Sequence, residues 1–143
     1  MMSIVAAVAR AVASELEVGK FSIPFKPVFA FRHDQALPEG KELRVTVVPK
    51  GVAMAPASRG ACAYDVEVWV AIMRKLGGGG TEILDPLLGL VEEITDFFRL
   101  RRLEKFPEAM WTGTELKPVI SAEHLEGLRQ FSSLVAISFK VVR

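Results

Sequence analysis

The stretch from Tyr64 to Lys75 constrains the fold more than any other part of the chain. Apolar side chains occupy every second position in it, which is the period of a β-strand with one buried face. These residues are Val66, Val68, Val70 and Ile72. The positions between them mix charged and large side chains, so we predict that the second face is partly covered and partly in water. They are Asp65, Glu67, Trp69 and Met73.

Other segments predict further strands. Residues 43–48 alternate in the same way, and Pro49 and Gly51 are expected to end that strand. The last segment alternates from Phe131 to Val141 and predicts a C-terminal strand. A short strand is expected at residues 28–32, where the neighbouring prolines exclude a central place in a sheet.

Two segments carry the apolar spacing of helices. Residues 3–17 are predicted to form a helix that Ser3 caps and Gly19 ends. A second helix is expected to begin with Asp85 as its N-cap and Pro86 as its first residue. We predict that its apolar stripe is buried on the sheet: Leu87, Leu88, Val91, Ile94, Phe97 and Phe98.

The region after the second helix is less regular. Residues 103–120 are expected to lack regular structure, and Ser121 is expected to cap a short helix that reaches Gln130. At 143 residues the chain is about one domain long. We therefore predict a single α+β domain over residues 1–143, with an antiparallel four-stranded sheet and helices packed on one face. The expected order is helix, strand, strand, strand, helix, short helix, strand.

Residues 49–63 are predicted to form a long hairpin loop between two of these strands. Their alanines, glycines and prolines supply little apolar mass to hold a loop against the core. A loop of this length in a compact domain is typical of a functional or disordered segment. We expect it to be mobile in the isolated subunit and ordered by a partner. The alternative is a spacer without a role.

Composition excludes several classes of protein. The net charge of +1 gives no general attraction to nucleic acid or to a membrane surface, and no stretch approaches the roughly 18 apolar residues of a membrane span. The lone Cys62 cannot form an intrachain disulfide and is interpreted as a small filler rather than a nucleophile. These features predict a soluble protein that is made inside the cell.

Searches for catalytic patterns find none in the sequence. His33 and His124 lie far apart, without the ligand spacing of a zinc site. Glu92 and Glu93 are adjacent on a predicted helix, so they diverge by about 100° and cannot face each other. We therefore predict no enzymatic activity, no metal and no cofactor.

The order of elements carries a resemblance to a known family, through four stretches: "LRVTVVPKG", "YDVEVWVAIMRKL", "DPLLGLVEEITDFFR" and "EHLEGLRQFSSLVAISFKVVR". Together these resemble the tail terminator (tail completion) proteins of long-tailed bacteriophages and the related minor tail and head–tail joining proteins. The resemblance implies a six-fold ring at the head-proximal end of the tail tube. Such a ring stops tube polymerisation, offers a surface to the head connector protein and lets DNA pass through its centre.

Within that resemblance the protein would belong to the virion, be made in the host cytoplasm, and need no cofactor and no membrane. Four loop residues are candidates for the oligomer or partner interface: Lys50, Met54, Ser58 and Arg59. The candidates for contact with DNA in the lumen, or with a neighbour, are Arg44, Arg59, Arg101 and Arg102. The arginines after the second helix have a simpler alternative role in stabilising its end. Trp111 is a candidate interface aromatic or, alternatively, a core anchor.

Three rival hypotheses remain open from the sequence. A head-side neck or head completion protein is the nearest of them. A generic, non-enzymatic α+β binding module is the second, and a small enzyme is the third. A defined ring oligomer would separate the terminator hypothesis from a monomeric binding module.

Overall fold

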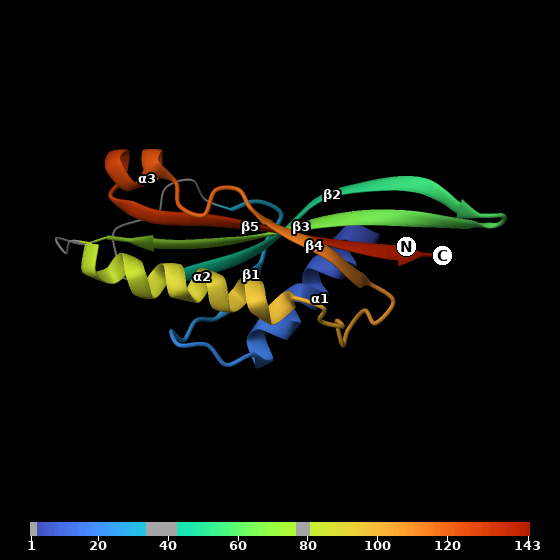
Figure 1. Ribbon diagram of the computed structural model, residues 1–143, viewed down its shortest axis with the longest axis horizontal. Coiled ribbons are helices and arrows are strands. Elements are labelled where there is room, and N and C mark those ends of the chain that lie inside the picture. The colour runs from blue at the N-terminus through green and yellow to red at the C-terminus, as the bar shows by residue number, and fades with distance from the viewer. Residues whose placement is uncertain (1–2, 34–42, 77–80) are drawn as a thin grey trace.

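The computed structural model describes residues 3–33, 43–76 and 81–143 (Figure 1). Its elements are α1 (Ile4–Val18), β1 (Pro27–Phe29), β2 (Arg44–Ser58), β3 (Ala61–Lys75), a 3₁₀ turn (Thr81–Ile83), α2 (Leu84–Phe98), β4 (Met110–Leu116), α3 (Ala122–Gly127) and β5 (Gln130–Val142). The strands form one sheet in the order β1-β2-β3-β5-β4. Neighbouring strands are antiparallel except β1, which runs parallel to β2.

The predicted α+β class is therefore confirmed, and the sheet differs in detail. It has five strands and is mixed, where four antiparallel strands were expected. The additional strand is β4, which lies inside the segment predicted to be irregular. That prediction was wrong because β4 pairs on one side only and is half exposed, so its sequence lacks the apolar alternation of a buried strand.

One face of the sheet, which we call the helix face, is covered by α1 and α2 (Figure 1). The predicted stripe of α2 is buried there at Leu87, Val91, Ile94 and Phe98, and Leu90 joins it. The strands contribute the fully buried side chains of the predicted alternation, from Val66 to Ile72 on β3 and from Val135 to Phe139 on β5.

The opposite face, which we call the open face, is only partly covered, as the alternation predicted. Asp65 is exposed and Trp69 is half-buried, whereas Ala71 and Met73 are buried near the other end of β3. The short helix α3 lies on this side of the sheet, not with α1 and α2 (Figure 1). The expectation that all helices pack on one face is therefore wrong for α3.

The predicted loop at residues 49–63 is instead a continuation of the hairpin. β2 runs on to Ser58 and β3 begins at Ala61, so only Arg59 and Gly60 form the turn. Backbone pairing with β3 stabilises this segment, and that pairing needs no apolar side chains. The expected mobile loop is thus replaced by a two-stranded ribbon.

Pro49 does not end β2 because the strand accommodates it with a β-bulge. The pairing register shifts by one residue between Pro49 and Gly51. β1 covers β2 only from Val45 to Val47, so no described strand needs a backbone N–H from Pro49.

Helix ends agree with the sequence where a local cap was expected, with one exception. Ser3 caps α1 by accepting from the N–H of Ala6 at 3.4 Å, and Ser121 caps α3 by accepting from the N–H of His124. α3 ends at Gly127, and Gln130 already belongs to β5. Asp85 is not a cap, because a 3₁₀ turn leads into α2 and places Asp85 inside its first turn.

Candidate interaction surface

The outer part of the β2–β3 hairpin, residues 49–65, projects beyond the helix layer, and we call it the arm (Figure 1). Most of its β2 residues are exposed, including the apolar side chains of Val52 and Met54, at 49% and 64%. β5 accompanies β3 along the arm, and Cys62 exchanges two backbone hydrogen bonds of 3.0 Å with Arg143. The arm is therefore a strand-built projection with exposed apolar side chains.

The four predicted interface residues all lie on the arm, spread along its length. The ammonium of Lys50 lies 4.3 Å from the centre of the Trp69 ring, which holds it at the arm's base. Met54 lies opposite Tyr64 in mid-arm. Ser58 and Arg59 are exposed at the tip. The four residues therefore lie in a line along a ribbon rather than in a cluster.

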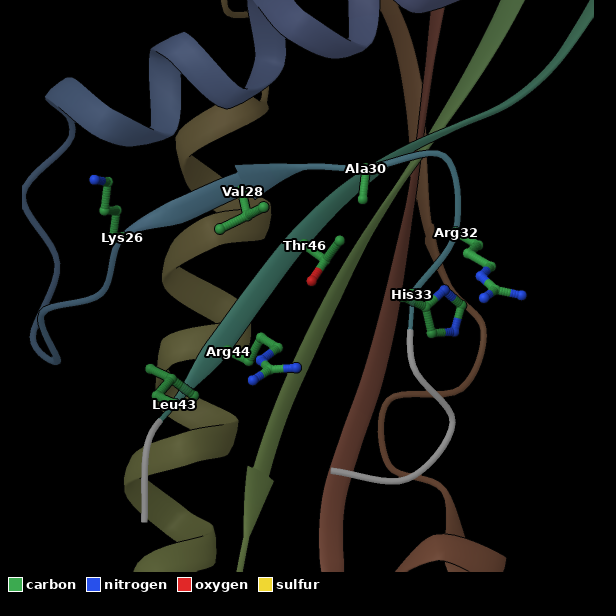
Figure 2. Close-up of a pocket in the computed structure, with 8 residues that line it drawn as sticks. All are labelled: Lys26, Val28, Ala30, Arg32, His33, Leu43, Arg44 and Thr46. Carbon is green, nitrogen blue, oxygen red and sulfur yellow. The ribbon is translucent and has the colours of Figure 1, made fainter. Parts of the chain in front are cut away.

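Arg44 lies at the opposite end of β2 from Arg59. It lines a pocket of about 390 Å³ on the open face, together with Lys26, Arg32 and His33 (Figure 2). Figure 2 shows these side chains together with the aliphatic Val28, Ala30 and Leu43, which also line the pocket. No local pattern in the sequence predicts this gathering of basic residues, because they come from three separate segments.

Arg101 has a contact within the subunit instead of a free surface position. Its Nε donates to Oε1 of Glu15 at 2.6 Å, and its guanidinium carbon lies 3.8 Å from the centre of the Phe97 ring. Glu15 is only 4% exposed, and its Oε2 also accepts from the backbone N–H of Glu104 at 3.2 Å. The guanidinium thus neutralises a buried carboxylate. Its neighbour Arg102 is exposed.

Trp111 lies in β4 opposite Phe139 and packs at the margin of the core. Its Nε1 donates to Oγ1 of Thr114 at 2.9 Å. The side chain also lines a pocket of about 310 Å³ with Leu100 and Met110, which are both exposed. Trp111 therefore packs partly against the core, and its role as an interface aromatic stays a prediction.

A polar cluster on the open face attaches α3 to the sheet, and no sequence pattern predicts it. Oγ of Ser132 lies 2.7 Å from Nδ1 of His124 and accepts from Nε2 of Gln130 at 2.8 Å. Both histidines of the chain border the adjoining pocket of about 260 Å³, so the fold brings His33 and His124 to one place. Among the described residues, no group of three His, Cys, Asp or Glu side chains could hold a metal ion.

In the parts of the chain that the structure covers, no helix is long and apolar enough to span a membrane.

No family model and no curated protein matches this chain. Among solved structures, it is similar to the sheath/tube terminator of an extracellular contractile injection system, PVC, determined by cryo-EM in the extended state. The match covers 100% of this chain and 57% of that one, with a TM-score of 0.50 and 11% sequence identity. The chain thus spans little more than half the length of that terminator. The expected resemblance to a tail terminator is confirmed as a likeness of fold.

Proposed function

We propose that this chain is a tail terminator, a structural protein that sits on the end of a tail tube and stops its polymerisation. The observation that carries the proposal is the likeness of fold to a sheath/tube terminator along all 143 residues. The projecting arm supports the proposal. It would contact the last layer of the tube, while the rest of the subunit presents another surface away from the tube. No site chemistry is required for such a role.

In its finer form, the proposal is a six-fold ring at the head-proximal end of a phage tail. The ring would contact the tube protein on one side and the head connector protein on the other, and DNA would cross its centre. The exposed Arg59 at the arm's tip suits contact with DNA phosphates or with an acidic neighbour. A head-side neck protein is the nearest alternative, and it differs in which of the two partners it binds first.

Tube assembly in vitro tests the proposal. The tail tube protein of the same genome is polymerised with and without this chain, and tube lengths are measured by electron microscopy. We expect short tubes with a gold-labelled copy of this chain at one end. Adding the chain after polymerisation serves as the control, since it should label ends without shortening the tubes.

Two outcomes would contradict parts of the proposal. Tubes that keep their length and carry no label would exclude a terminator. Binding to the isolated head connector protein, without binding to tube ends, would favour the head-side alternative.

A further inference from the structure

The outer edge of β2 along the arm carries free backbone groups at only a few positions. Cys62 exchanges its hydrogen bonds with β5, so by alternation Tyr64 and Val66 also direct their backbone groups toward β5. Their partners on β2, Met54 and Val52, consequently direct their N–H and C=O groups away from β3. Within the described chain, no strand covers this edge beyond Val47.

Prolines delimit this edge at both ends. Pro49 and Pro56 stand opposite Val68 and Cys62, in positions that also face outward. Because proline has no N–H, neither can donate to an added strand. The edge therefore accepts a short partner strand, centred on Val52 and Met54.

The other free edge of the sheet is the outer side of β4. Lys117 donates its N–H to the carbonyl of Leu134 at 2.8 Å, so it faces β5. By alternation, Leu116 and Thr114 direct their backbone groups outward. β4 ends the sheet in the described residues, and its outer edge contains no proline.

The two edges run in opposite directions, and Thr114 on β4 is level with Pro49, at the inner end of the arm edge. Pairing β4 with Val52 and Met54 therefore staggers successive copies along the strands. Thr114 pairs with Ile137, Ile137 with Val68, and Val68 with Pro49, which borders the arm edge. The three pairings from β2 to β4 are all antiparallel, so β4 runs opposite to β2. A second copy in the same orientation therefore presents its β2 to this β4 as an antiparallel partner.

The side chains on both edges also point to the same side. Met54 and Val52 lie opposite Tyr64 and Val66, and Val66 is buried on the helix face. Thr114 and Leu116 lie opposite Ile137 and Val135, which are buried on that face as well. Pairing the two edges thus keeps the helix layers of successive copies on one side, as a closed ring requires. It also covers the two exposed apolar side chains of the arm.

We propose that the arm edge of one copy pairs with β4 of the next, with Met54 opposite Thr114 and Val52 opposite Leu116. All four of these residues carry an outward N–H, so the junction gains four backbone hydrogen bonds. The interface is head-to-tail, because two different edges meet, and such an interface closes into a ring when its rotation closes. This inference rests on the proposed function for its ring, and it names the surfaces that build the ring.

Disulfide cross-linking tests the junction on the purified full-length chain. Residues directly opposite each other in a hydrogen-bonded pair have Cα atoms about 5.5 Å apart, within the range of a disulfide. In a Cys62→Ala background, Met54→Cys protein is mixed with Thr114→Cys protein and oxidised. We expect a heterodimer by mass spectrometry, whereas each variant alone stays uncross-linked. The double variant should give a ladder that ends at a closed oligomer.

Ala53→Cys mixed with Thr114→Cys is the matched control, because the side chain of residue 53 points to the open face. That pair should not cross-link. A disulfide between two copies of Met54→Cys would overturn the inference, since it requires a two-fold junction. Absence of the Met54–Thr114 cross-link at the highest soluble concentration, with tube protein present or absent, would also overturn it.

A backbone variant gives an independent measurement. Met54→Pro removes one outward N–H that the subunit's own sheet does not use, so the melting temperature should stay unchanged while the oligomer is lost. Met54→Val keeps the N–H and should keep the oligomer. An oligomer that survives Met54→Pro intact contradicts the pairing. Tube capping without the cross-link would refute this inference alone, and cross-linked rings that leave tubes uncapped would refute the proposed function alone.

Discussion

Glu15 is a buried carboxylate on α1, and Arg101 is the cation that compensates it. We expect Arg101→Ala to cost about 1 to 3 kcal/mol of unfolding free energy, because it removes the cation beside the buried carboxylate, which keeps only its bond from the Glu104 N–H. Urea unfolding followed by circular dichroism measures the change. Arg102→Ala is the matched control, and it should change stability by less than about 0.5 kcal/mol since Arg102 is exposed. Equal effects of the two substitutions would refute the assigned role of Arg101.

Residue-scale features were predictable from the sequence where their causes are local. The caps at Ser3 and Ser121 lie within three residues of the N–H groups that they accept from. The Glu15–Arg101 pair joins positions 86 residues apart, and no periodicity reports such a partner. For that reason the sequence predicts Arg101 only as a candidate for contact with DNA or a neighbour, or as a charge that stabilises the helix end, and does not predict its bond to Glu15.

At the scale of elements, the buried stripe of α2 gives a direct measure of how that helix stabilises the sheet. Ile94 is fully buried in the core. We expect Ile94→Ala to cost about 2 to 5 kcal/mol, through lost burial and the cavity that it leaves. Thermal and urea unfolding measure the change. Glu92→Ala, on the exposed side of the same helix, should cost less than about 0.5 kcal/mol. A small effect at both positions would mean that α2 contributes little to the core.

The turn of the arm allows a local test of the hairpin. Gly60 has a φ of 83°, a conformation that disfavours side chains, although a Cβ there meets no atom within 4 Å. Gly60→Ala should therefore destabilise the arm by about 1 kcal/mol through backbone strain alone. Hydrogen exchange at residues 53–58 should speed up while the global melting temperature stays nearly constant.

Gly51→Ala is the control for that substitution. Its site is equally open and has no positive φ, so the added Cβ meets neither atoms nor strain. Unchanged exchange in Gly60→Ala would show that the tip is already open in solution, as a mobile loop would be.

The sequence pattern predicts most elements correctly. It predicts a loop at residues 49–63, where the arm is a paired hairpin, and the reason can be identified. β3, β5 and α2 bury one side against the core, and burial imposes a period on their residues. The outer half of β2 and all of β4 obtain their order from backbone pairing while their side chains stay largely exposed. Apolar periodicity cannot detect such strands, and the prolines and glycines in β2 suggested a loop instead. The same elements carry the proposed junction between copies, and of its four residues only Met54 was named as an interface candidate from the sequence.

At the scale of the whole molecule, different roles are proposed for the arm and for the body, by which we mean the sheet with α1 and α2 packed on it. The core lies where α1 and α2 cover the sheet, whereas the arm's tip is exposed. The edge proposed to join copies is centred on Val52 and Met54, closer to the body than the tip. A variant that removes the tip and keeps this edge therefore separates reach toward the tube from association between copies.

The last prediction uses that separation. Residues 56–62 are replaced by Asn-Gly, which joins the paired residues Ala55 and Ala63 through a two-residue turn. Unfolding free energy should fall by about 1 kcal/mol or less, because the deleted residues are mostly exposed. Native mass spectrometry should show the same oligomer as the full chain, since Val52 and Met54 remain. Tube capping should nevertheless be lost, because the tip is the part that reaches beyond the body. Tubes shortened as efficiently as by the full chain would show that the tip is only a spacer, and loss of the oligomer would place the contacts between copies at the tip itself.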